Sequence, residues 1–204
     1  MSADYAAGLP LPLRREPFPV NDRRGSLSIL LFIATEATLF VMLFASYWYM
    51  GRSAPQWPPD PAPKLHYSIP MLAILLGSSA VLHWGEQQIK KHRVRAGMMA
   101  LATTIFMGIV FLILSVLEYS EHLGTLMPTK DAYASIFYTI VTLHAAHVVL
   151  GLCMLSFALL LPSVEPRPGT PHRPYHNAAL YWHFVDTVWV FVIIFLYVIP
   201  NIRQ

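Results

Sequence analysis

Ionisable side chains occur inside long apolar stretches of this sequence, and they are the residues best suited to chemistry. Glu36, His144, His147, His183 and Asp186 all lie within such stretches. Burying a charged group in a membrane costs free energy, so such residues usually serve a function and face the interior of a bundle. Carboxyl and imidazole groups can hold or pass protons, and both can ligate metals.

The depths of these residues can be compared if each stretch is a helix that crosses the bilayer. Glu36 then lies about 15 Å from the start of its stretch, at roughly 1.5 Å per residue. His144 and Asp186 lie at similar depths in theirs, near the middle of a hydrocarbon core about 30 Å thick. We therefore expect the three residues to share one level, at which they could meet inside a single bundle.

Glu36 allows two interpretations that are compatible with each other. The carboxyl group could be neutral and hydrogen-bonded to a neighbour such as Thr35 or Thr38. It could also take part in proton transfer, which is a common role for a carboxyl group at this depth.

His144 and His147 are three residues apart, so they share a helix face, and Gly151 continues that face. The pair could be half of a haem or metal site. Such a site needs further ligands, and His83 and His183 are the only other histidines inside the stretches. A structural, hydrogen-bonded pair of histidines is the favoured interpretation.

The segment from Trp182 to Asp186 lies near the start of the last stretch. Its simplest interpretation is a tryptophan at the membrane interface. In the same segment, a contact between His183 and Asp186 would orient the helix.

Other polar positions have simple interpretations. Glu118 and Glu121 end the third stretch, where water can solvate them, and the small residues 77–80 suit close packing of helices. The sequence contains no glycine-rich phosphate loop, nucleophile elbow or HExxH motif, so nothing indicates an active site in this chain.

The composition indicates a chain embedded in a membrane. Only 12% of the 204 residues are charged, about half the share found in soluble domains. The formal charge of +3 does not indicate nucleic-acid binding, because the basic residues lie in loops between the apolar stretches. Cys153 is the single cysteine, so an internal disulfide or a cysteine-based metal site cannot form.

Five stretches reach the length of about 20 residues that a bilayer requires. Lipid offers no partners to backbone groups, so these stretches should be helices. The sequence predicts an all-α integral membrane protein, a bundle of five transmembrane helices at 27–204 that follows a polar cytoplasmic segment at 1–26. The first stretch is predicted to be a retained helix rather than a cleaved signal. The expected helices cover approximately residues 27–50, 67–89, 96–118, 133–161 and 177–200.

The orientation follows from the Lys and Arg residues. Ten of them lie on the side of the N-terminus and four on the other side. Because the basic side of a membrane protein faces the cytoplasm, we expect the N-terminus inside and the C-terminus outside.

Several motifs, in order along the chain, resemble subunit III of cytochrome c oxidase and related haem-copper oxidases. The stretch from Tyr181 to Phe191 resembles the family's YWHFVDxVWxF signature, and the helix with His144 and His147 is similar to its FHGLHV helix. Three further segments match the family's helix with a buried, carbodiimide-reactive glutamate, its LLxSS segment and its EY pair: Thr35-Glu36 with Phe40 and Phe44, residues 75–80, and Glu118-Tyr119.

The resemblance implies a five-helix form of this subunit, without the first two helices of longer members. Such a subunit carries no redox centre, because haem and copper lie in partner subunits. It packs on subunit I near subunit II, binds phospholipid, and supports proton uptake and stability during turnover. Glu36 would be the family's buried carboxylate, and the signature positions would be His144, His147, Trp182, His183 and Asp186, with Glu118 in the EY pair.

The chain also departs from the family pattern. His176 stands where we expect a glutamate, seven residues before His183, and the preceding segment 171–175 is unlike the family's. His172 and Arg173 remain candidates for lipid headgroup contacts.

In this family, other subunits bind the electron donor, so this chain does not determine which donor is used. The YWHFVD form of the motif favours cytochrome c over quinol. A homologue associated with nitric oxide reductase is a further family alternative. Outside the family, the chain could be a haem-binding membrane cytochrome that uses His144 or His147, or a small proton-coupled transporter that uses Glu36 and Asp186. The expected location is the bacterial inner membrane, with other respiratory complexes as possible partners.

Overall fold

The computed structural model describes residues 22–54, 57–58, 66–123, 131–160 and 173–202. Every regular element in these ranges is helical, and five helices are long and apolar enough to cross a membrane, as predicted. The elements are α1 (Asp22–Ser53), α2 (Ser68–Lys90), α3 (Val94–Leu123), α4 (Ala132–Leu160), α5 (Arg173–Val192), the π-helix η1 (Ile193–Val198) and α6 (Ile199–Ile202). The N-terminal segment 1–21 lies outside the described residues.

The helix ends differ from the expected ones by a few residues, for local reasons. α5 begins at Arg173 rather than at residue 177 because Pro174 is tolerated in a first helical turn, where its missing N–H has no partner to lose. α2 ends in a tight turn, where the backbone N–H of Arg93 donates to Gln88 O at 2.9 Å and His92 adopts a φ of 59°.

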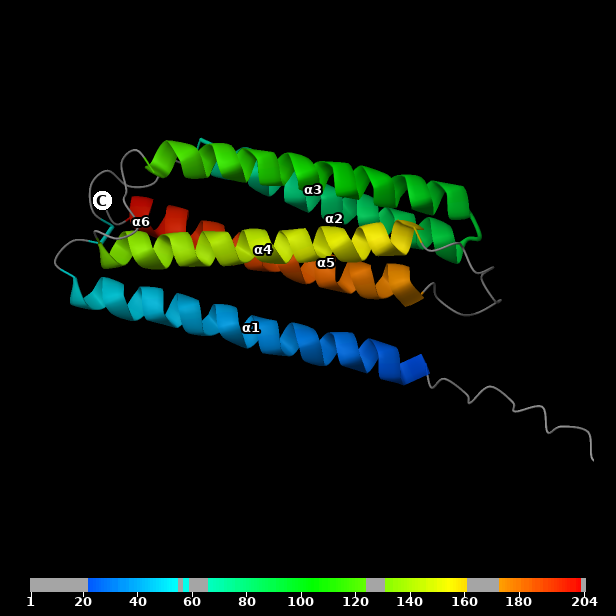
Figure 1. Ribbon diagram of the computed structural model, residues 1–204, viewed down its shortest axis with the longest axis horizontal. Helices are drawn as coiled ribbons and strands as arrows, with labels where there is room; N and C mark the ends of the chain where they lie inside the picture. Colours follow the sequence, from blue (N-terminus) through cyan, green and yellow to red (C-terminus); the bar gives the residue numbers. More distant parts are fainter. Residues whose placement is uncertain (1–21, 55–56, 59–65, 124–130, 161–172, 203–204) are drawn as a thin grey trace, which may run out of the picture.

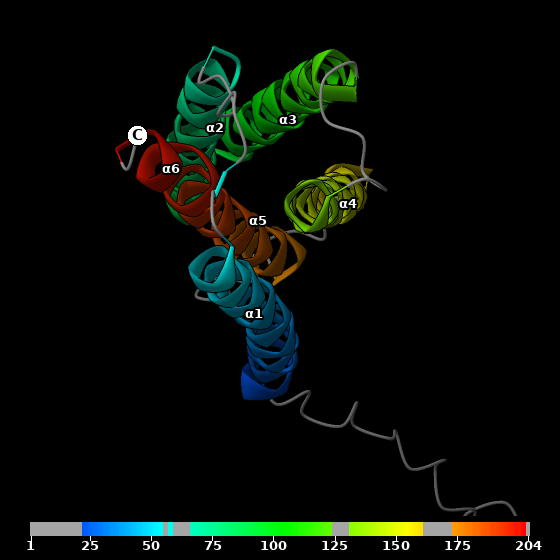
Figure 2. The same cartoon turned by 90° about the vertical axis from the view of Figure 1, so that its left-hand side faces the viewer.

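α5 occupies the centre of the bundle. It packs against α1, α2 and α4, while α3 lies against α2 and α4 (Figure 2). Its buried face carries the largest side chains of the core, among them Trp182, Trp189 and Tyr181. The start of α1 and the α2–α3 turn lie at the same end of the bundle (Figure 1).

Close approach of α2 and α3 depends on two glycines. A Cβ at Gly85 would collide with Ala100 and the Tyr175 hydroxyl, and a Cβ at Gly97 would collide with Ile89. Small residues allow helix backbones to approach closely in membranes. The predicted close packing of α2 is therefore seen, and its tightest contacts are at Gly85 and Gly97 rather than at residues 77–80.

The last helix is not a uniform α-helix. Six residues, Ile193–Val198, form a π-helix before the short α6. A π-helix bonds each residue to the fifth one along, so it turns the following side chains relative to a continuous α-helix. Hydropathy detects the length of such a stretch but not this local change.

Candidate functional site

Glu36 of α1 and His147 of α4 form a direct bond across the helix interface. Glu36 Oε2 lies 2.8 Å from His147 Nε2, and the side chains are 23% and 9% exposed. This bond agrees with the predicted common depth of Glu36 and His144, since His147 lies one turn after His144 on α4, while the same depth for Asp186 stays a prediction. The prediction that Glu36 bonds Thr35 or Thr38 is wrong, because both hydroxyls donate to the backbone of their own helix.

The proton on this pair can be located from its second bond. His147 Nδ1 lies 2.7 Å from the carbonyl oxygen of Leu143, which can only accept, so Nδ1 carries a hydrogen. The Nε2 atom then either accepts a proton from a neutral Glu36 or donates one to its carboxylate. In both states one proton lies between the two side chains, so the pair is a site at which a proton can be held and exchanged.

An aromatic lining isolates this pair from one side. Phe40, one helical turn after Glu36, is 2% exposed, and its ring centre lies 4.9 Å from that of His147. Only apolar groups touch the imidazole there, so the Glu36 carboxyl is its one side-chain bonding partner among the described residues.

His144 differs from His147, which contradicts the interpretation of both as a hydrogen-bonded pair. It is 1% exposed, and neither ring nitrogen bonds to any described residue. Its ring stacks on Trp189 at 4.9 Å and meets Phe40 and Phe111 edge-on. Aromatic packing therefore places His144, and only His147 engages a carboxyl group.

Trp182 lies in the core and not at the membrane interface, so that prediction is wrong. It is 0% exposed, and its indole N–H donates to Ser78 Oγ at 2.9 Å. The ring fits between Gly108 and Gly151, where an added Cβ would approach it to 2.7 and 2.9 Å. The glycine that continues the histidine face of α4 thus makes room for this tryptophan.

His183 and Asp186 do not pair with each other, which corrects a further prediction. His183 Nδ1 bonds the Ser79 hydroxyl of α2 at 2.5 Å. Asp186 is 3% exposed, and neither of its carboxyl oxygens has a hydrogen-bond partner among the described residues. Ser79 therefore connects His183 of α5 to α2.

Glu118 is buried, although a position near the end of a helix suggests solvation. It is 4% exposed, and its Oε1 accepts hydrogen bonds from Ser68 Oγ at 2.8 Å and from Tyr197 Oη at 3.2 Å. Glu121 is exposed, as predicted.

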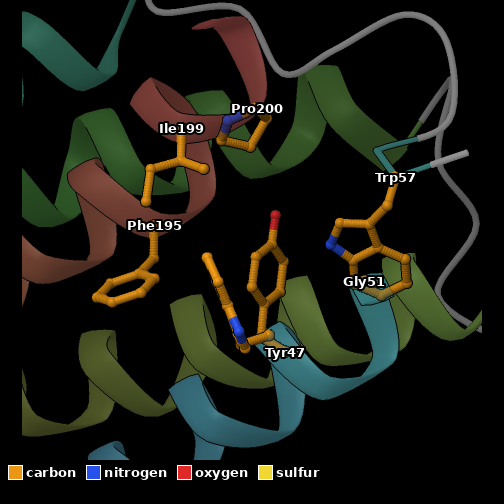
Figure 3. A pocket seen from close by; sticks show the side chains of 7 residues that line it. Tyr47, Gly51, Trp57, Phe195, Ile199 and Pro200 are labelled. Carbon is orange, nitrogen blue, oxygen red and sulfur yellow. The ribbon is translucent and has the colours of Figure 1, made fainter. Parts of the chain in front are cut away.

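A shallow aromatic pocket lies at the end of α1, away from the Glu36 pair (Figure 3). The ring of Trp57 covers Gly51, and its centre lies 5.3 Å from that of Tyr47. Phe195 of η1 lines the same pocket.

Two predicted residues lie wholly or partly outside the described part of the chain. His172 lies outside the described residues, and the side chain of Arg173 is also outside them, so their headgroup contacts remain predictions. In the part of the chain that the structure describes, no three His, Cys, Asp or Glu side chains gather as metal ligands would.

Sequence reasoning also missed a cross-helix pair near the end of α2. His176, noted only for replacing an expected glutamate, lies 2.9 Å from Glu86 of α2 through its Nδ1 atom. Lys90 also reaches the Glu86 carboxyl, at 3.1 Å. The signal was present in the sequence, because Glu86 is an acidic residue within the second apolar stretch.

Comparison with known proteins agrees with this arrangement. The family model described as cytochrome c oxidase subunit III matches residues 21–200. The chain belongs to this family. Three similar proteins, each called cytochrome c oxidase subunit 3, come from Synechocystis, Myxine glutinosa and Thermostichus vulcanus. Their identities are 34%, 32% and 33%, over 84%, 83% and 86% of this chain and 74%, 67% and 87% of their own lengths.

Membership of the subunit III family has direct consequences. The chain is a membrane protein of the respiratory chain, and other oxidase subunits are its partners. The histidine helix and the WHFVD segment, on which the resemblance depended, form the contacts between α4, α5 and their neighbours.

Proposed function

We propose that this chain is a non-catalytic subunit of a respiratory haem-copper oxidase that uses cytochrome c. It packs on subunit I, binds phospholipid, and supports proton uptake and stability during turnover. Haem and copper belong to the partner subunits. The observation that carries the proposal is the bond between Glu36 and His147, which holds a proton at membrane depth.

The surroundings of Glu36 and His147 favour an auxiliary role for this pair rather than a catalytic one. His147 is fixed by the Leu143 carbonyl and enclosed by Phe40, while His144 lies among aromatic rings. A proton site that is fixed in this way can buffer or relay protons for a neighbouring subunit. It can also join α1 to α4, because the bond crosses between these helices.

The surface supports an orientation and a place for lipid. Exposed side chains of α1 are largely apolar, among them Leu27, Leu31, Val41 and Met42, and suit acyl chains. Lys91 and Arg93 are exposed at the α2–α3 turn, at the end where α1 begins (Figure 1). In the bacterial inner membrane that we propose as the location, the positive-inside rule favours this end in the cytoplasm.

We expect Glu36→Ala to leave the haem content of the purified oxidase unchanged. The substitution removes the proton that Glu36 and His147 share, and it touches no redox centre. Initial turnover should stay near that of the unsubstituted enzyme, whereas activity should decay several-fold sooner during sustained turnover. Haem is measured by the pyridine haemochrome spectrum and decay by continuous oxygen consumption.

Thr38→Val is the matched control, since Thr38 lies two residues after Glu36 and its hydroxyl bonds the backbone of its own helix. It should behave as the unsubstituted chain does. Loss of haem in Glu36→Ala would overturn the non-catalytic assignment, and equal decay in both variants would remove the role given to the carboxyl group.

The isolated chain tests the assignment of haem to partner subunits. Purified alone in detergent, it should show no Soret band, because His144 is enclosed by Trp189, Phe40 and Phe111. The absorbance spectrum is recorded after haem is added to the chain and the excess is removed. A stoichiometric Soret band that His144→Phe abolishes would favour a membrane cytochrome instead.

A further inference from the structure

One side of the α2–α5 pair carries a row of polar side chains. We call these residues the polar row: Ser79, His83, Glu86 and Gln87 of α2 with His176 and His183 of α5. His83 lies four residues after Ser79, Glu86 and Gln87 lie three and four residues after His83, and His183 lies seven after His176, so the residues of each helix share a face. Bonds connect them: Ser79 to His183 at 2.5 Å, His176 to Glu86 at 2.9 Å and His83 to Gln87 at 3.0 Å.

The row extends into the membrane. α2 ends at Lys90, so His83 lies about 10 Å and Ser79 roughly 16 Å from that end, at about 1.5 Å per residue. A hydrocarbon core about 30 Å thick puts Ser79 near its middle. The row therefore runs from the end of the bundle to about mid-depth.

These side chains are open to the outside of the bundle, unlike the buried polar groups. His83 and Gln87 are exposed, while Ser79, Glu86 and His183 are partly exposed. By contrast, His144, Glu118 and Asp186 are at most 4% exposed. Polar and ionisable groups that face acyl chains cost free energy, so such a row is unfavourable where only lipid covers it.

No described helix of this chain covers the row. α2 packs on α3 and α5, and α1 lies against the side of α5 that faces α4 (Figure 2). Elsewhere on the surface, exposed hydroxyls already have hydrogen-bond partners within this chain, so they need none from another subunit. Thr35 and Thr38 of α1 and Thr103 of α3 bond the backbone of their own helices. In the row, the amide and imidazole groups of Gln87 and His83 keep further donors and acceptors directed outward.

We infer that the polar row is the surface on which this chain docks a transmembrane helix of a partner oxidase subunit. The partner helix carries hydroxyl, amide or carboxyl side chains at the same depth, which complete the hydrogen bonds of the row. The inference rests on the proposed function, since it names where the oxidase partner binds. The apolar outer faces of α1 and α3 are then left to lipid.

Two exposed alanines provide a matched test. Ala80 lies one turn before His83 on the exposed side of α2, and Ala102 is exposed on α3. Both lie within the membrane and eight to ten residues from the α2–α3 turn. A benzophenone amino acid is placed at either position in the intact, co-expressed oxidase, the membranes are irradiated, and products are identified by mass spectrometry.

Position 80 should cross-link this chain to a partner subunit, and position 102 should cross-link chiefly to lipid. His83→Leu should also reduce the share of this chain retained by the complex in mild detergent several-fold, although leucine suits lipid better than histidine does. The control Phe106→Leu, on the exposed side of α3, should retain the chain fully.

The possible failures can be told apart. Cross-links to a partner from position 102 but only to lipid from position 80, in an intact complex, would overturn the docking surface alone. Full retention of His83→Leu would also count against it. An unsubstituted chain that co-purifies with no oxidase subunit would overturn the proposed function and this inference together.

Discussion

Trp182→Ala should destabilise this chain by about 3–5 kcal/mol, the usual cost of removing a fully buried tryptophan. The indole is 0% exposed at the centre of the bundle and fills the space between Gly108 and Gly151. Its loss leaves a cavity among three helices and removes the donor to Ser78. Reversible unfolding of the detergent-solubilised chain by added SDS measures the change in free energy.

Trp84→Ala is the control, since Trp84 belongs to α2 but is 50% exposed. It removes the same side chain from a surface position and should cost far less. Trp182→Phe should fall between the two because it keeps part of the ring volume and loses the hydrogen bond to Ser78. Equal losses for the two alanine variants would show that the indole of Trp182 does not stabilise the core.

The number and extent of the helices could be predicted from the sequence, because one physical constraint decides them. A backbone in lipid must bond within its own helix, and a span requires about 20 apolar residues. Boundaries shifted by a few residues, and at the start of α5 the local reason is Pro174, which is tolerated in a first helical turn. The π-helical turn at Ile193–Val198 was not predictable, since it does not change the apolar character of the stretch.

The contacts of the site were less predictable than the depth of its residues. Depth follows from counting residues along a helix, and on that basis Glu36, His144 and Asp186 were expected at one level. Which faces meet depends on how the helices rotate and pack. This decided that Glu36 bonds His147 rather than Thr38, and that His183 bonds Ser79 rather than Asp186.

A position near a helix end is a particularly weak guide to burial, as Glu118 shows. The chain folds α2 and the π-helical turn over this residue, and Ser68 and Tyr197 are both 0% exposed. The two acidic residues near the end of α3 differ for this reason. Glu118 faces the bundle, whereas Glu121, three residues later, is exposed.

Glu118→Leu should therefore destabilise the chain more than Glu121→Leu does. Leucine removes the carboxyl oxygen that accepts the hydrogen bonds of Ser68 and Tyr197, and an unsatisfied buried polar group costs about 1–3 kcal/mol. Glu118→Gln keeps an acceptor oxygen of the same reach and should lose much less. The same unfolding measurement by SDS compares the three variants.

A double-mutant cycle with Tyr197→Phe separates this bond from general packing. Tyr197→Phe removes a hydroxyl that donates a hydrogen bond to Glu118 Oε1. Glu118→Leu should therefore lower the free energy of unfolding less in the Tyr197→Phe background than in the unsubstituted chain. Ser68→Ala should reduce the cost in the same way. The losses of unfolding free energy could simply add in the double variants, or Glu118→Leu could lose no more than Glu121→Leu does. Either result would show that the carboxyl group does not hold α2 and the π-helical turn together. The π-helical turn would then need another explanation, because its clearest consequence is that it brings Tyr197 to a buried carboxyl group.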